Sequence, residues 1–176
     1  MKKIELRPLG IADEEQARIA AEEFDADFDF LLGVHGLTWE NYLVKLSDEA
    51  AGRHLPAGYV PATFLGAFVG DDLVGRVSIR HYLNDFLLRS GGHIGYGVRP
   101  RFRKRGYATE ILARALEFTD SLGVDRVLVT CDDSNIGSAR VIEANGGLCE
   151  NRIENNGSIV RRYWIARDIR ALKPAR

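Results

Sequence analysis

The chain has 176 residues, of which 45% are hydrophobic and 28% are charged, and its formal net charge is −1. This composition is that of an ordinary globular protein, and we expect one domain over residues 1–176. The near-zero charge gives no overall attraction to nucleic acid or to an anionic membrane surface. No apolar run approaches the roughly 18 residues of a membrane span, and the first residues lack a signal-peptide pattern. The two cysteines, Cys131 and Cys149, lack disulfide-framework spacing, which favours a cytoplasmic location.

Hydrophobic periodicity predicts a mixed α/β sheet with helices on both faces, in the order β-α-α-β-β-β-α-β-α-β-β. The predicted strands cover residues 3–8, 62–69, 73–80, 92–98, 124–131, 148–154 and 158–167. The predicted helices cover residues 13–24, 38–51, 106–122 and 135–144. Turn residues at 70–72 and 155–157 predict two hairpins, because glycine and asparagine favour the tight turns that join antiparallel strands.

An acidic stretch laced with phenylalanines, residues 22–30, follows the first predicted helix. Its carboxylates, those of Glu22, Glu23, Asp25 and Asp27 among them, are one means of attracting a cationic substrate. The alternative is a solvated helix end whose phenylalanines enter the core. Both interpretations stay open at the level of sequence.

A cationic turn, residues 99–105, lies between the strand that ends at Val98 and the helix that begins near Gly106. Backbone N–H groups, a glycine and the positive end of a helix dipole meet at this point, which is an arrangement that binds phosphate groups. A solvated basic loop and a nucleic-acid patch are the alternatives. The balanced net charge argues against nucleic acid.

Two common phosphate motifs are absent. The chain has no G-x-x-x-x-G-K-[ST] string, and so a P-loop nucleotide site is excluded. Gly95-Tyr96-Gly97 begins like a dinucleotide fingerprint, but Pro100 stands at the position of the third glycine.

Arg103-Lys104-Arg105-Gly106-Tyr107-Ala108 resembles the [RQ]-x-x-G-x-[GA] signature of the GNAT superfamily, the Gcn5-related N-acetyltransferases. The segment from Asn135 to Ser138 is similar to the N-x-x-[AS] helix start of the same superfamily. Residues 91–96 and 162–165 resemble a bacterial subgroup known mainly as predicted acetyltransferases. The resemblance covers about residues 55–166, while the N-terminal third matches only loosely.

This resemblance implies acetyl-coenzyme A as the cofactor, with its pyrophosphate on the cationic turn. It implies that the pantetheine arm pairs with a strand that splays away from its neighbour, and that Asn135 contacts the arm. Asn135 also suits a helix N-cap, and the two roles are compatible. The implied cofactor-binding residues are Tyr96, Val98, Arg103, Lys104, Arg105, Gly106, Tyr107, Ala108, Thr109, Asn135 and Ser138.

The catalytic residues are less clear from the sequence. Many GNAT enzymes place a proton-donating tyrosine seven residues after the motif asparagine, where this chain has Ile142. His93 and Tyr96 are the candidates on the strand before the turn, although His93 is also typical of a buried structural histidine. His81 has a standing similar to that of His93. Cys131 lacks a readable His/Asp arrangement for covalent catalysis, and no histidine or cysteine spacing predicts a metal site.

The expected function is transfer of an acetyl group from acetyl-CoA to a primary amine of a small molecule or peptide, by direct attack. The alternative is a catalytically silent acyl-CoA-binding sensor module. The apolar final strand, residues 158–165, suits either a homodimer contact or the completion of the sheet.

Overall fold

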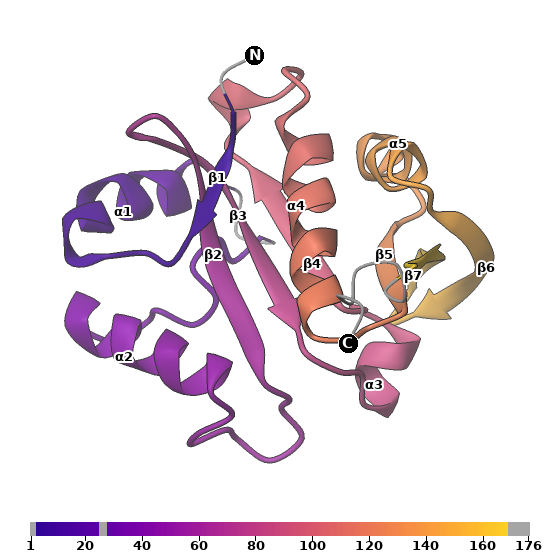
Figure 1. Ribbon diagram of the computed structural model, residues 1–176, viewed down its shortest axis with the longest axis horizontal. Helices are drawn as coiled ribbons and strands as arrows, with labels where there is room; N and C mark the ends of the chain where they lie inside the picture. The colour runs from indigo at the N-terminus through magenta and orange to yellow at the C-terminus, as the bar shows by residue number, and fades with distance from the viewer. Residues whose placement is uncertain (1–2, 25–27, 169–176) are drawn as a thin grey trace, which may run out of the picture.

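The computed structural model describes residues 3–24 and 28–168, and in this part of the chain seven strands form two antiparallel sheets (Figure 1). The four-stranded sheet has the order β1 (Glu5–Arg7), β2 (Ala62–Val69), β3 (Asp72–Arg80) and β4 (Ile94–Val98). The three-stranded sheet has the order β5 (Arg126–Asp132), β7 (Ser158–Ala166) and β6 (Leu148–Asn155). The two sheets meet where the start of β4 approaches β5.

Helices cover both faces of the four-stranded sheet, as predicted. Figure 1 shows α1 (Glu14–Glu22) and α2 (Trp39–Ala50) on one face and α4 (Tyr107–Ser121) on the other, with α5 (Ile136–Ala144) beside the three-stranded sheet. The predicted mixed α/β element order is confirmed, with one addition, the short helix α3 (Asp85–Arg89). Asn84 caps α3 by accepting a hydrogen bond from the Leu87 N–H at 2.9 Å. Sequence reasoning missed α3 because five residues are too few to show helical periodicity.

Two hydrophobic cores lie on opposite faces of the four-stranded sheet. The core under α4 and α5 takes Val77 and Ile79 from β3, and the core under α1 and α2 contains Trp39 and Phe68. Successive side chains of a strand point to opposite faces. The residues of β3 that alternate with Val77 and Ile79, which are Arg76, Ser78 and Arg80, therefore face α1 and α2.

The segment that precedes β4 fixes where that strand begins. Gly91 and Gly92 have φ values of 106° and 62°, a conformation that glycine adopts without steric cost. The strand predicted from residue 92 therefore begins at Ile94. The second predicted hairpin is confirmed, with Asn156 and Gly157 at φ values of 50° and 80°, as a type I′ turn requires.

An ion pair joins the end of α1 to the cationic turn. The guanidinium of Arg99 is fully buried and donates to both carboxylate oxygens of Glu23, at 2.6 and 2.9 Å, and to the carbonyl of Leu73 at 2.8 Å. Arg101 lies 3.3 Å from the same carboxylate. Glu23 thus belongs to the interior structure and is not a substrate-attracting charge.

The phenylalanines of the acidic stretch pack inward, as the alternative interpretation predicts. Phe24 stacks on Phe28 and Phe30, with ring centroids 4.6 and 5.2 Å apart. The hypothesis that Asp25 and Asp27 attract the substrate lies outside the described residues.

We predict that Glu23→Gln destabilises the fold by about 3 kcal/mol, because it leaves the buried Arg99 guanidinium without an opposite charge. The measurement is the free energy of unfolding in urea. The control is Glu22→Gln, which removes the same charge from an exposed neighbour. Equal losses in the two variants would show that the ion pair does not stabilise the fold.

Candidate functional site

The cationic turn forms an exposed cradle of backbone N–H groups. After the 3-10 turn Pro100–Phe102, Lys104 and Gly106 both adopt left-handed backbone conformations, with φ values of 61° and 79°. Gly106 is the N-cap of α4, and the first N–H groups of a helix have no acceptor inside the helix. Free N–H groups at the start of a helix, together with the helix dipole, are an arrangement that suits an anion.

The positive charges of the turn divide into two groups. Arg99 and Arg101 are paired with Glu23, and the Nε of Arg103 donates to the carbonyl of Val98 at 3.1 Å. Lys104 and Arg105 are exposed, and within residues 3–24 and 28–168 no carboxylate lies within salt-bridge distance of either. These two side chains, together with the exposed Arg103, which pairs with no described carboxylate, are therefore the charges available to an anion at the start of α4.

The second feature is the gap between β4 and β5. The Arg99 N–H donates to the carbonyl of Val74, and the carbonyl of His93 accepts from the Arg80 N–H, so residues 93 and 99 bond toward β3. Hydrogen-bonding direction alternates along an antiparallel strand. The backbone N–H and C=O groups of Ile94, Tyr96 and Val98 therefore face the gap.

Tyr96 and Ser138 meet across this gap. The hydroxyl of Tyr96 lies 2.9 Å from Ser138 Oγ, and burial raises the pKa of the phenol to about 12. Ser138 belongs to the first turn of α5, where Asn135 is the N-cap and accepts from the Ser138 N–H at 3.0 Å. The structure thus brings Tyr96 of β4 together with Asn135 and Ser138 of the N-x-x-[AS] segment, which were predicted from separate parts of the sequence. A phenol with this pKa is neutral at physiological pH, which makes Tyr96 a hydrogen-bond donor and not a base.

The nearby residues Ile142 and Cys131 have structural surroundings. Ile142 is completely buried in the core under α4 and α5, at the position where a tyrosine was expected from the resemblance. Burial raises the pKa of the Cys131 thiol, so the thiolate needed for a covalent route is disfavoured. The described residues contain no group of three or more side chains suited to hold a metal ion.

His93 lies where the two sheets meet. Its Nδ1 accepts a hydrogen bond from the Leu128 N–H at 3.0 Å, and the backbone N–H of His93 donates to the Leu128 carbonyl at 2.7 Å. Burial and the positive charge of Arg80 lower the pKa of His93 to about 4. The neutral ring accepts a hydrogen bond from the backbone of β5. This contact favours a structural role for His93 over a catalytic one. His81 lies apart from it, with Nε2 at 2.8 Å from Thr63 Oγ1, and burial lowers its pKa.

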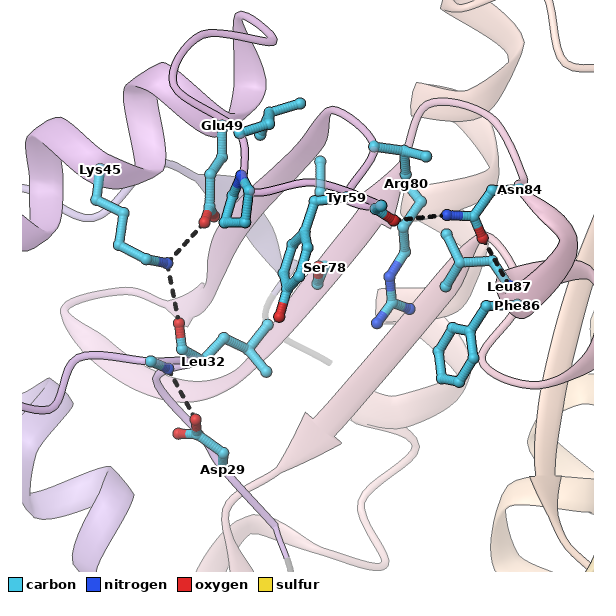
Figure 2. A pocket seen from close by; sticks show the side chains of 16 residues that line it. Asp29, Leu32, Lys45, Glu49, Tyr59, Ser78, Arg80, Asn84, Phe86 and Leu87 are labelled. Atoms are coloured by element: carbon cyan, nitrogen blue, oxygen red, sulfur yellow. Dashed lines mark hydrogen bonds and ion pairs between the residues drawn. The ribbon is translucent and has the colours of Figure 1, made fainter. Parts of the chain in front are cut away.

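A pocket of about 740 Å³ opens on the face of the four-stranded sheet that α1 and α2 cover. It lies between α2, α3 and the ends of β2 and β3. Figure 2 shows the Arg80 side chain directed into it, with Ser78 and Tyr59 on one side and Phe86 on the other. Lys45 and Glu49 of α2 pair with each other at 2.7 Å on its far wall. Because Arg80 also lies beside Gly95, the pocket borders β4, whose edge forms the gap.

Sequence reasoning missed this pocket and its arginines. The signal was present in β3, where Arg76, Ser78 and Arg80 alternate with apolar residues in a strand that is buried almost throughout. A polar side chain at every second position of a buried strand indicates that one face of the strand borders a polar site or a ligand.

Comparison with known proteins also indicates an acetyltransferase. The family model of the acetyltransferase (GNAT) domain matches residues 3–147. An uncharacterized N-acetyltransferase of Bacillus subtilis, YnaD, is 24% identical over 126 residues, which are 61% of this chain and 72% of YnaD.

Two solved structures illustrate the similarity of fold. RimJ of Mycobacterium smegmatis, in complex with CoA-disulfide, superposes with a TM-score of 0.69 at 19% identity, covering 93% of this chain and 81% of RimJ. The yncA protein of Salmonella typhimurium, with its cofactor acetyl-CoA, superposes with a TM-score of 0.62 at 14% identity, covering 93% of each chain. Among the described residues, no helix has the length and apolarity needed to cross a membrane.

We predict that His93 stays neutral, with its proton on Nε2, from about pH 5 to about pH 8. Its pKa in the folded state is about 4, below the ordinary 6.5, so its contribution to stability is complete above about pH 6.5 and is lost as the pH falls toward 4. Nitrogen-15 NMR of the imidazole would follow the charge, and thermal unfolding across the same pH range would follow the stability. His93→Gln should flatten that slope, whereas the exposed His35→Gln should not. Protonation of His93 near pH 6.5 would contradict the prediction.

Proposed function

The chain belongs to the GNAT acetyltransferase family, and on that premise we propose that it transfers acetyl to a primary amine of a small molecule or peptide by direct attack. Dependence on acetyl-CoA follows from the family. The observation that carries the proposal is the position of β4. One edge of this strand faces the gap that suits the cofactor, and one face borders the pocket that suits an acceptor. The cytoplasmic location, the single domain over 1–176 and a homodimer stay predictions.

In this proposal, the turn and the gap hold acetyl-CoA. The N–H groups of Gly106, Tyr107, Ala108 and Thr109 bind the pyrophosphate, with Lys104 and Arg105 supplying positive charge. The pantetheine amides pair with Tyr96 and Val98 as an added strand would, while Asn135 and Ser138 close the opposite side. The bond from Arg103 to the Val98 carbonyl breaks when the cofactor binds. A pantetheine N–H then donates to the carbonyl, and Arg103 donates to a phosphate oxygen.

The same elements supply the chemistry. The amine nitrogen forms a bond to the thioester carbon, the C–S bond breaks, and a proton of the amine ends on the departing sulfur. Backbone N–H groups that face the gap, that of Val98 included, stabilise the oxygen on which negative charge develops. The neutral Tyr96 phenol donates a hydrogen bond to the sulfur and so takes the place of the tyrosine that is absent at Ile142. His93 has no part in this scheme, because its Nδ1 is already occupied.

We predict that Gly106→Glu weakens coenzyme A binding by about 100-fold or more, because a carboxylate would stand where the pyrophosphate binds. Calorimetry at low and at high salt measures the effect, and wild-type binding should weaken with salt because Lys104 and Arg105 contribute.

Gly106→Ala is the matched control for backbone strain. It forces a side chain into the left-handed conformation at φ 79° without adding charge, at a cost of about 1–2 kcal/mol. If both variants bind as the wild type does, the pyrophosphate lies elsewhere. If the wild type does not bind coenzyme A, the proposed function is wrong.

We predict that Tyr96→Phe lowers kcat by about 10- to 100-fold, which is the usual effect of losing one hydrogen bond to a charged group. The KM for acetyl-CoA should change little, because the phenol acts on the sulfur only as its charge develops. Thiol release with a saturating amine is the readout. Tyr163→Phe removes the same atom from a buried tyrosine whose hydroxyl donates to Glu143, and it serves as the control. An unchanged kcat in Tyr96→Phe would remove Tyr96 from the mechanism.

A further inference from the structure

Two guanidinium groups lie together on the face of β3 that borders the pocket. A Cβ at Gly95 of the neighbouring strand would lie 3.1 Å from Arg80 Nη1 and 3.9 Å from Arg76 Nη1. Ser78 stands between the two arginines on the same face. Like charges so close together repel each other, and burial adds to the cost.

The described part of the chain provides little compensation for these charges. Arg76 donates to the carbonyls of Gly95 and Asp29, each at 3.1 Å, and among the described residues its buried Nε has no partner. For Arg80, residues 3–24 and 28–168 offer neither a hydrogen-bond acceptor for the side chain nor a carboxylate within 4.0 Å. Burial lowers the pKa of both groups, to about 10 for Arg76. Arg99, by contrast, is fully buried and has both oxygens of Glu23.

The other charged side chains around the pocket do not neutralise Arg80, because each has a partner of its own. Lys45 and Glu49 neutralise each other at 2.7 Å, and an oxygen of Asp29 is held by the Gly33 N–H at 2.7 Å. Tyr59 and Phe86, which are 65% and 70% exposed, flank the pocket with aromatic rings. Figure 2 shows the Arg80 guanidinium directed between them into the open volume. The pocket therefore combines aromatic and apolar walls with a cation, Arg80, that pairs with no carboxylate in the part of the chain that the structure describes.

We propose that Arg80 binds a carboxylate of the acetyl acceptor, so that the acceptor is an amino carboxylate and not a polyamine. The planar guanidinium presents two parallel N–H donors that match a carboxylate, and Ser78 offers a hydroxyl beside it. Arg76, held behind by two carbonyls, adds positive charge at this point. That the bound carboxylate belongs to the acetyl acceptor rests on the proposed function. That Arg80 forms an anion site does not depend on it.

The topology also limits the distance between the carboxylate and the amine. Arg80 belongs to β3, but its guanidinium lies beside Gly95 of β4. The thioester would lie on the strand added beyond β4, about one strand spacing of ~4.8 Å from that point. Only a few covalent bonds span that distance. Amino acids and short ω-amino carboxylates meet this requirement, with an apolar body placed between Tyr59 and Phe86.

A binding experiment tests the anion site without turnover. Benzoate and benzamide are titrated by calorimetry into the full chain saturated with coenzyme A. The charged ligand should bind about tenfold or more tightly than the neutral one, and Arg80→Gln should abolish the difference. Arg18→Gln, which changes an exposed arginine of α1 paired with Glu14, should retain it. Equal binding of benzoate and benzamide, or unchanged benzoate binding by Arg80→Gln, would overturn the inference.

A kinetic experiment separates the substrate class from the proposed function. Matched pairs of amines, phenylalanine with phenylalaninamide and 4-aminobutyrate with 4-aminobutyramide, are compared by thiol release. The acid of at least one pair should be preferred about tenfold or more in kcat/KM, with the preference lost in Arg80→Gln through KM. Turnover without preference for the acid in either pair would overturn the inference and leave the proposed function standing. If no amine reacts while benzoate binding still depends on Arg80, the proposed function fails and the anion site stands.

Unfolding is not an alternative explanation for these results. Because Arg80 is a partly buried charge that pairs with no carboxylate in the described residues, Arg80→Gln should keep or raise the melting temperature. Arg80→Lys should keep part of the benzoate binding. A melting temperature that falls in both variants would indicate that Arg80 has a structural role, and would overturn the inference.

Discussion

The separation of β4 from β5 is the constraint on which the site depends. A β-strand in a continuous sheet has no free backbone groups, and a cofactor with amide bonds can pair with it only at an open edge. Here His93, the residue before β4, is hydrogen-bonded to Leu128 of β5, and among the described strands β4 itself is paired on its other side only, with β3. A Cβ at Gly92 would stand 2.4 Å from the Leu128 carbonyl, so the close approach at this junction requires glycine. The tight junction and the open edge are therefore parts of one feature.

The rest of the molecule holds that edge in place from both sides. On one side, α4 packs on β4 and begins directly after the cationic turn, so the proposed pyrophosphate site and the edge share one rigid element. On the other side, Phe28 covers Gly97 so closely that a Cβ there would lie 2.5 Å from the ring. The ion pair between Arg99 and Glu23 then ties α1 to the residue that follows β4. Packed groups thus connect the N-terminal segment directly with β4 and with the turn that follows it.

The sequence predicted those parts of the candidate site that depend on residues close together in the chain. The turn, the glycine at the start of α4 and the Asn135 cap depend on neighbours in the chain, and their residues were recognisable. Arg99 was counted among the phosphate-binding charges, although it is buried against Glu23, 76 residues away. The pocket was missed because its walls come from α2, α3 and two strands, and no periodicity reports such an assembly. The contact between Tyr96 and Ser138 likewise depends on how α5 lies over the gap.

Arg99 and the two arginines on one face of β3, Arg76 and Arg80, differ in what they do to the fold. Arg99 is paired and fully satisfied, so its burial is compatible with stability. Arg76 and Arg80 retain positive charge on one face without a carboxylate in the described residues, which is unfavourable for the folded state and is tolerated in proteins mainly at functional sites. That charge also favours the neutral form of a nearby amine, because a cation lowers the pKa of an ammonium group beside it. When a carboxylate pairs with Arg80, Arg76 still carries its charge next to Gly95. In the complex that we propose, the same pair of residues serves two needs of acetyl transfer, by holding the acceptor through its acid group and by disfavouring protonation of its amine.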